Sequence, residues 1–99
     1  MARQRLSSSE IAEIVQALPD WSIDAAGTGL LRTYRFESFA SAIGFMTECA
    51  IFADKIDHHP EWKNVYKTVE VRLTTHSAHG ITELDRDLAK YMEEVARRH

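Results

Sequence analysis

Residues 62–76 read WKNVYKTVEVRLTTH, and this stretch decides the fold. Its first part, Trp62–Tyr66, is a candidate strand, because aromatic and β-branched residues favour strands. In its second part, residues 69, 71, 73 and 75 are Val, Val, Leu and Thr, and they alternate with charged or polar residues. This alternation is the period of a strand with one buried face. We therefore expect two antiparallel strands here, the second of which ends at His76.

A similar pair of strands is expected earlier in the chain. Trp21–Asp24 can form one strand, and residues 25–29 contain two glycines, which favour a turn. Residues 30–36 follow as the second strand, in which Leu30, Tyr34 and Phe36 share a mostly apolar face. These segments predict a hairpin.

Three helical segments surround the strand pairs. Ser7 and Glu10 have the spacing of a capping box at the start of the first helix, and Ser38 can cap the second and longest. Thr82 can cap the last helix, with Asp85 at its third position. The order αββαββα predicts an α+β two-layer sandwich, in which a four-stranded antiparallel sheet carries three helices on one face.

The longest helix has two apolar sides. One side is expected to face the core and consists of Phe39, Ala42, Ile43, Met46, Ala50, Ala53 and Ile56. Phe45, Cys49 and Phe52 lie off this stripe and are apolar as well. A second apolar side is typical of a helix that packs against another subunit, so we expect a homodimer or homotetramer.

Composition limits the function. The chain has 99 residues, of which 44% are hydrophobic and 27% charged, so we expect one soluble globular domain over residues 1–99. Its 12 Lys and Arg residues are outnumbered by 15 Asp and Glu residues, and the formal net charge is −3. Phosphate backbones are bound by clustered basic side chains, so direct nucleic-acid binding is not expected. A small neutral ligand or another protein fits this charge better.

A cytoplasmic location is expected. Cys49 is the only cysteine, so it has no partner for an intramolecular disulfide, and we expect it to be buried in the core. Met1–Ser9 carries two arginines but no apolar region typical of a signal peptide. The longest uncharged run, residues 38–47, is far too short to span a bilayer, so no membrane partner is expected.

Three imidazoles and one carboxylate are the candidate functional groups. His58 and His59 stand side by side before Pro60, which stiffens the turn, and His76 and Asp85 follow later. Imidazole has an unperturbed pKa of about 6.5, so it can both give and take a proton near neutral pH. Two adjacent histidines can therefore supply an acid and a base. Taken alone, they could also be polar turn residues that follow a helix.

The sequence around these histidines resembles the pterin-4a-carbinolamine dehydratase family from Phe36 to about Val95. The resemblance rests on three elements in a fixed order, which together are far more specific than any one of them. These elements are Asp54-Lys55-x-x-His58-His59-Pro60-x-Trp62-x-Asn64-Val65-Tyr66, Leu73-x-Thr75-His76 and Gly80-Ile81-Thr82-x-x-Asp85-x-x-Leu88-Ala89. His79 is an additional imidazole in the turn before Gly80, and we expect it to be a solvated loop residue.

The resemblance implies an enzyme of pterin recycling. Its reaction dehydrates a 4a-hydroxy-tetrahydropterin, which aromatic amino-acid hydroxylases leave as a product, to the quinonoid dihydropterin and water. A proton must reach the departing C4a hydroxyl and another must leave ring nitrogen N5. The resemblance assigns His58 and His59 as the acid/base and substrate-binding pair, and His76 as a further imidazole across the pocket. It implies neither a metal nor a cofactor.

Five further residues are expected to bind the substrate or support the histidines. The resemblance implies that Asp85 orients one of the rings, and it adds Pro60, Trp62 and Thr75 around the pocket. Asp54 stands where family members often have Glu, and its shorter side chain could still reach a histidine or the pterin. Simpler explanations exist for two of these residues, since Trp62 could pack in the core and Asp85 could only cap the last helix.

Two other functions compete with this interpretation. A site of two histidines and an aspartate could suggest zinc or non-haem iron, but adjacent side chains such as His58 and His59 seldom converge on one ion. The second alternative is a protein-binding module, because vertebrate members of the family also act as coactivators that bind the dimerisation helices of a homeodomain transcription factor. That role would use the apolar side of the long helix around Phe45 and Phe52.

Overall fold

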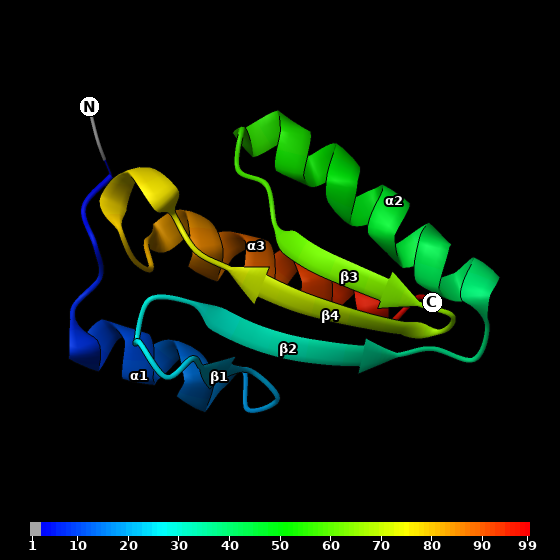
Figure 1. The fold of residues 1–99 in the computed structure, drawn as a ribbon, viewed down its shortest axis with the longest axis horizontal. Helices are drawn as coiled ribbons and strands as arrows, with labels where there is room; N and C mark the ends of the chain where they lie inside the picture. Colours follow the sequence, from blue (N-terminus) through cyan, green and yellow to red (C-terminus); the bar gives the residue numbers. More distant parts are fainter. Residues whose placement is uncertain (1–2) are drawn as a thin grey trace.

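The computed structural model describes residues 3–99, which form three α-helices and a four-stranded sheet in the expected order αββαββα (Figure 1). The elements are α1 (Ser8–Ala17), β1 (Ser22–Ile23), β2 (Leu30–Arg35), α2 (Phe39–Ile56), β3 (Glu61–Val65), β4 (Thr68–Leu73), the short 3-10 helix η1 (His76–Ala78) and α3 (Glu83–Ala96). Among these described residues, no helix is both long and apolar enough to cross a membrane.

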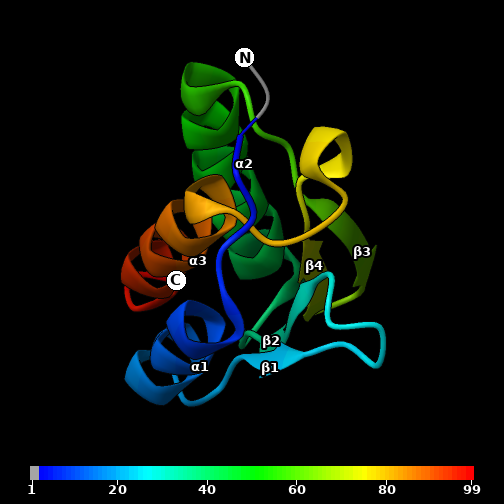
Figure 2. The same cartoon turned by 90° about the vertical axis from the view of Figure 1, so that its left-hand side faces the viewer.

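The sheet joins the two strand pairs through β2 and β4. All neighbouring strands are antiparallel, and their order across the sheet is β1-β2-β4-β3. β2 and β4 pair along their full length, from Leu30 opposite Leu73 to Arg35 opposite Thr68. Figure 2 shows α1, α2 and α3 gathered on one side of the sheet. The predicted α+β sandwich with helices on one face is confirmed.

Two strands are shorter than expected. β1 contains only Ser22–Ile23, because Trp21 turns into the core, where its ring meets that of Tyr34 edge-on with 6.4 Å between the centroids. β4 ends at Leu73, so the prediction that His76 ends this strand is wrong. Beyond Leu73 the chain curls into η1, and a single bridge between Thr75 and Gly80 closes the curl.

Side-chain caps begin the helices at the predicted positions. At α1, the Ser7 hydroxyl accepts the Glu10 N–H at 3.2 Å, and the Glu10 carboxylate accepts the Ser7 N–H at 2.8 Å. The hydroxyl of Ser38 accepts the N–H of Ser41 at the start of α2. Thr82 and Asp85 form the second capping box, at the start of α3. Capping boxes satisfy backbone N–H groups that have no partner within the helix, so they determine where these helices begin.

The structure buries a different apolar side of α2 from the one that the sequence predicted. The side of Phe45, Cys49 and Phe52, predicted at a subunit contact, faces the core: Phe45 and Cys49 are fully buried, and Phe52 is half-buried. Phe39 and Ile43, predicted in the core, are 49% and 39% exposed. The predicted core stripe is correct only where it runs beside the buried side, at Ala42, Met46, Ala53 and Ile56.

Aromatic packing explains which side of α2 is buried. The ring of Phe45 lies 4.7 Å from that of Tyr34 and 4.9 Å from that of Phe36, both extending from the β2 region. The ring of Phe52 stacks at 4.0 Å on Tyr91 of α3. Burial of large aromatic side chains removes much apolar surface from water, and this side of α2 meets aromatic partners from the β2 region and α3, so it packs into the core.

Candidate active site

His58 lies just beyond α2, where the backbone turns sharply. Asp57 ends the helix in the left-handed region with φ of 52°, and its N–H donates to the carbonyls of Ala53 and Asp54. The N–H of His58 donates to the Ala53 carbonyl as well, at 3.0 Å. These hydrogen bonds satisfy the last carbonyls of α2, and the left-handed conformation of Asp57 turns the chain away from the helix. His58 is therefore buried, and its Nε2 lies 2.5 Å from Oδ1 of Asp85.

Asp85 is completely buried at the third position of α3. A buried carboxylate is costly unless hydrogen bonds satisfy it, and here both oxygens have partners. Oδ1 faces His58, while Oδ2 accepts the Thr82 N–H at 2.9 Å and the Thr75 hydroxyl at 2.8 Å. The hydroxyls of Thr75 and Thr82 lie 2.7 Å apart. Asp85 thus makes both contacts that the sequence left as alternatives, one to the helix start and one to a histidine.

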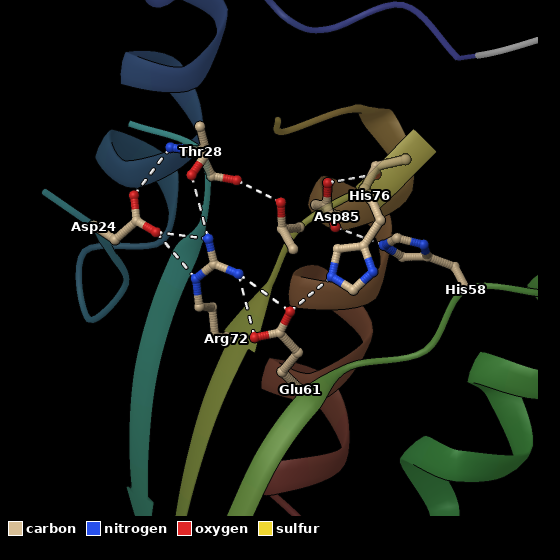
Figure 3. A network of polar contacts seen from close by, with 9 residues as sticks. Asp24, Thr28, His58, Glu61, Arg72, His76 and Asp85 are labelled. Atoms are coloured by element: carbon tan, nitrogen blue, oxygen red, sulfur yellow. Dashed lines mark hydrogen bonds and ion pairs between the residues drawn. The ribbon is translucent and has the colours of Figure 1, made fainter. Parts of the chain in front are cut away.

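His76 is the first residue of η1, and its side chain is 80% exposed. Its Nε2 lies 2.8 Å from Oε2 of Glu61, the first residue of β3. His76 directly follows Thr75, which contacts Asp85, so the backbone between residues 75 and 76 connects the His76–Glu61 pair to the His58–Asp85 pair (Figure 3). The hydrogen bond from His76, together with one from Arg72, holds the pKa of Glu61 below its usual range.

His59 points away from His58. Consecutive side chains of an extended backbone face opposite sides, and the His59 side chain is 61% exposed. Its Nε2 lies 2.9 Å from Oδ1 of Asp54, which is exposed on the last turn of α2. The shorter Asp side chain therefore does reach a histidine. The structure brings His58, Thr75 and Asp85 together and places His76 beside them in the chain, while His59 and Asp54 form a separate surface pair.

The three candidate imidazoles share one feature, a carboxylate at Nε2. A carboxylate only accepts hydrogen bonds, so in each pair Nε2 is the donor and Nδ1 is the nitrogen left for other partners. Such carboxylate partners orient an imidazole and select its tautomer. Among residues 3–99, no three or more His, Cys, Asp or Glu side chains are grouped as ligands for a metal ion.

Pro60 and Trp62 shape the entry into β3. Pro60 is half-buried between α2 and the strand. Trp62 is half-buried too and packs against the core, whereas Glu61 beside it is exposed. Alternate residues of a strand face opposite sides of a sheet. Trp62 therefore packs in the core, which is the simpler of the two roles that its sequence context allowed.

An open cavity of about 440 Å³ lies beside His76. This volume falls within the range of small-molecule pockets. The residues that line it come from the turn after β1, from β4 and from the η1 segment, and they are Thr28, Arg72, Thr74, His76 and His79. His79 is exposed, as expected, but it also contributes to this cavity.

Sequence reasoning missed Glu61 and Arg72, which are charged side chains next to the candidate histidines. In the β3–β4 hairpin, Val65 pairs with Thr68 across a two-residue connection, and this register places Glu61 opposite Arg72. The short connection is the signal that could have found them. A hairpin register derived from it matches the two opposite charges across the strands.

Comparisons with known proteins agree with this architecture. A family model described as "Pterin 4 alpha carbinolamine dehydratase" matches residues 4–95. A protein of Chelativorans sp., provisionally named a pterin-4-alpha-carbinolamine dehydratase, is 50% identical over 96 residues, which cover 97% of this chain and 98% of the relative. A Brucella ovis protein with the same provisional name is 45% identical over 97% of this chain and 99% of its own.

Two solved structures share the fold. The crystal structure of a "transcriptional coactivator/pterin dehydratase" from Brucella melitensis has a TM-score of 0.91 and 43% identity, and the match covers 94% of this chain and 99% of that chain. A pterin dehydratase-like protein, identified as a RuBisCO assembly factor in the alpha-carboxysome, has a TM-score of 0.67 and 19% identity over 78% of this chain and 89% of its own. At that identity the second likeness concerns the fold alone.

The antiparallel sheet with helices on one face is shared with the Brucella melitensis structure, and this fold places the chain in the class of pterin dehydratase-like proteins. Within that class, the family model and the relatives agree over nearly the whole chain. The chain belongs to the pterin 4 alpha carbinolamine dehydratase family.

Proposed function

We propose that this protein dehydrates a 4a-hydroxy-tetrahydropterin to the quinonoid dihydropterin, and so supports pterin recycling after aromatic amino-acid hydroxylation. Membership of the family supports the substrate class. The observation that carries the proposed chemistry is the buried His58–Asp85 pair, which Thr75 contacts, together with the exposed His76, which follows Thr75 in the chain. It puts one imidazole in a dry setting and another beside an open cavity.

The proposed reaction needs two proton movements and no redox step. The bond between C4a and its hydroxyl oxygen breaks, and a protonated imidazole supplies the hydrogen with which that oxygen leaves as water. N5 loses its proton to a second imidazole, and the N5–H electron pair becomes the new bond between N5 and C4a. We assign these transfers to the group His58, His59 and His76. Their Nε2 atoms are held by Asp85, Asp54 and Glu61, so Nδ1 is the nitrogen proposed to meet the substrate.

The direct test is an assay of the purified protein with freshly generated 4a-hydroxy-tetrahydropterin, with no metal or nucleotide added. We expect faster loss of this substrate than in buffer. Replacing His58, His59 or His76 by Ala should each lower the rate by about 10² to 10⁴, the usual contribution of one positioned proton-transfer group. Lys63→Ala is the matched control, because Lys63 is exposed on β3 and is expected to leave the rate unchanged.

Folding must be separated from catalysis in this test. His58→Ala leaves the buried Asp85 without one partner, so His58→Asn, which keeps a polar side chain there, is the second variant. Circular dichroism and the melting temperature identify variants that fold. Full activity in folded variants at all three histidines would contradict the assigned chemistry, and an inactive wild-type protein would contradict the proposed function itself.

We also propose that the protein is a homodimer or homotetramer, with the exposed side of α2 at the contact. Phe39, Ile43 and Ile51 are 49%, 39% and 67% exposed on this helix, and exposed apolar side chains grouped on one element are typical of association surfaces. Light scattering coupled to size-exclusion chromatography should give two or four chains per particle. Ile51→Glu should shift the particle toward the monomer, and a monodisperse wild-type monomer would contradict this part of the proposal.

A protein-binding module is the alternative function. It is favoured by the similarity to the Brucella melitensis protein, which is described as a transcriptional coactivator as well as a pterin dehydratase. Such a role would use the exposed side of α2, and not the side around Phe45 and Phe52, which is in the core. The Ile51→Glu variant distinguishes the two functions, because it should abolish protein binding and leave the dehydratase rate unchanged. The proposed location is cytoplasmic, in line with the single unpaired Cys49.

A further inference from the structure

Arg72 lies at the centre of a polar network on β4 (Figure 3). Its Nε donates to Oδ2 of Asp24 at 3.0 Å, and its Nη2 lies 2.9 Å from the same oxygen as an ion pair. Its Nη1 donates to both carboxylate oxygens of Glu61, each at 3.2 Å, and its Nη2 also donates to the Thr28 hydroxyl at 3.2 Å. The guanidinium thus joins the turn after β1 to the start of β3, and Glu61 carries the contact on to His76.

The turn between β1 and β2 is built to hold the Asp24 end of this network. Oδ1 of Asp24 accepts the Thr28 N–H at 2.9 Å, and the Asp24 N–H donates to the Gly29 carbonyl at 3.0 Å. These bonds fix the Asp24 side chain, and its Oδ2 is left for Arg72. The Asp24 side chain is 16% exposed and that of Arg72 is 33% exposed, so the pair is partly shielded from water.

Gly29 makes the close approach of Asp24 and Arg72 possible. A Cβ atom at this position would lie 2.7 Å from Nε of Arg72 and 2.8 Å from Oδ2 of Asp24, closer than side chains tolerate. A residue with any side chain would therefore push the guanidinium away from the carboxylate. The absence of a side chain at position 29 is what lets the two charged groups meet.

His76 depends on this network for its orientation. Its side chain is 80% exposed, so core packing does not restrain the ring, whereas the hydrogen bond from Nε2 to Glu61 does. Glu61 is itself 45% exposed, and an exposed carboxylate on a flexible stem is a poor anchor unless a second group holds it. Arg72 is that group, because one of its nitrogens contacts both oxygens of Glu61.

We propose that Arg72 is a positioning residue for His76. Anchored to Asp24, it holds the Glu61 carboxylate where Nε2 of His76 donates to it, and so leaves Nδ1 as the acceptor nitrogen of the neutral ring in a side chain that lines the open cavity. The effect of this arrangement on turnover rests on the proposed dehydratase function. The effect on the tautomer of His76 does not depend on that function, and it can be measured without substrate.

The first experiment measures the His76 tautomer by long-range ¹H–¹⁵N NMR of the full chain. In the wild-type protein we expect the Nε2–H tautomer to dominate the neutral ring. In Arg72→Gln the signals of the two ring nitrogens should move toward a mixture of tautomers, and in Arg72→Lys, which keeps the charge, they should move less. Arg35→Gln is the matched control, because Arg35 pairs with Thr68 at the opposite end of β4 and is exposed.

The second experiment measures turnover in the same proteins. We expect Arg72→Gln to lower kcat about 10-fold with a smaller change in KM. Groups that hydrogen-bond to a metal-bound histidine contribute about 10- to 100-fold to metal affinity or activity, and Arg72 is expected at the low end of this range because it acts through Glu61. Because Arg72 is proposed to act through Glu61, adding Arg72→Gln to Glu61→Gln should cause no further loss. Gly29→Ala is a second route to the same effect, since it displaces the guanidinium without changing any charge.

Two results would overturn the proposal. The first is an unchanged His76 tautomer in both Arg72→Gln and Gly29→Ala, since both disturb the network. The second is a double variant in which the losses from Arg72→Gln and Glu61→Gln multiply, because the two residues would then act independently. If the wild-type protein lacked dehydratase activity, the tautomer measurement would still judge the role of Arg72, while the proposed function would fail on its own.

Discussion

At the scale of single residues, Asp85 has the most demanding position in the molecule. It is fully buried, yet one oxygen faces His58 and the other accepts two hydrogen bonds, from Thr82 and Thr75. The cost of burying this charge is met only if all of these partners are present. A change at Asp85 is therefore expected to affect stability and the orientation of His58 together.

Asp85→Asn tests this expectation. The amide has the size of the carboxylate, but its NH₂ group must face either His58 Nε2 or the donors Thr82 and Thr75, so a hydrogen bond is lost unless the His58 ring changes its tautomer. We expect the free energy of unfolding to fall by about 1–3 kcal/mol, the cost of an unsatisfied buried polar group. Urea unfolding measures this change. Asp87→Asn is the control on the same helix, because Asp87 is exposed, and an equal loss there would contradict the role of burial.

Part of the candidate site could be predicted from sequence. The motif identifies His58, Thr75 and Asp85, which the structure brings into contact, because local elements place each of them. The pairing of His76 with Glu61 could not be read from a motif, since it depends on where η1 begins and on the register of β3. The residue types of a motif indicate which chemistry a site can perform. Which residues of two different segments contact each other depends on the register and the ends of those segments, which a motif does not contain.

At the scale of elements, capping residues are better predictors than periodicity. The caps at Ser7, Ser38 and Thr82 mark the starts of α1, α2 and α3 as expected, because a cap is a local hydrogen-bonding motif. The predicted core stripe on α2 is wrong at Phe39, Ile43 and Ala50, which are exposed, because both sides of the helix are apolar and only tertiary packing distinguishes them. The aromatic rings that select the side of Phe45 and Phe52 come from other parts of the chain, and they are Tyr34, Phe36 and Tyr91.

A pair of truncations on α2 tests which side is buried. Phe45 is fully buried among aromatic rings, so Phe45→Ala should lower the free energy of unfolding by about 3–5 kcal/mol. Phe39 is 49% exposed at the other side, so Phe39→Ala should cost clearly less. Chemical denaturation of both variants at the same protein concentration makes the comparison. A larger loss from Phe39→Ala would mean that the outward side of α2 contributes more to stability than the core.

At the scale of the whole molecule, hydrogen-bonded carboxylates stabilise the start of a helix and the contacts between distant segments. Glu10 caps α1, Asp24 and Glu61 bind Arg72, and Glu48 binds Arg98 and His99. Each of these four carboxyl groups has a pKa below its usual range. A hydrogen bond from Ser7 lowers that of Glu10, one from His76 that of Glu61, and one from His99 that of Glu48. For Asp24, burial opposes the shift, but hydrogen bonds from Thr28 and Arg72 outweigh it.

These shifts predict a loss of stability in acid. A carboxyl group whose pKa is lower in the folded than in the unfolded state stabilises the fold above its unfolded value. That stabilisation is lost as the pH falls through the folded value, because the folded state must then take up the proton. We expect unfolding free energies that are steady near neutral pH and decline below the usual pKa of Glu. Urea titrations from neutral pH down into the acid range measure this.

Glu61→Gln provides the internal check on the acid prediction. The variant has no carboxylate to protonate at this position, so the difference in stability between it and the wild-type protein should shrink as the pH falls. A wild-type stability that stays constant down to about pH 3, below the unperturbed pKa values of Asp and Glu, would show that the interactions of these carboxylates contribute little to folding.

Because Cys49 is buried, the reactivity of its thiol can report how often the folded protein unfolds. It is fully buried between elements of the core, and burial raises the pKa of its thiol to about 12. Thiol-directed reagents attack the thiolate, so the folded protein should resist them, while the unfolded chain should react at the ordinary rate of a free cysteine. The rate at which the wild-type protein is labelled would then measure how often it unfolds, without any engineered probe.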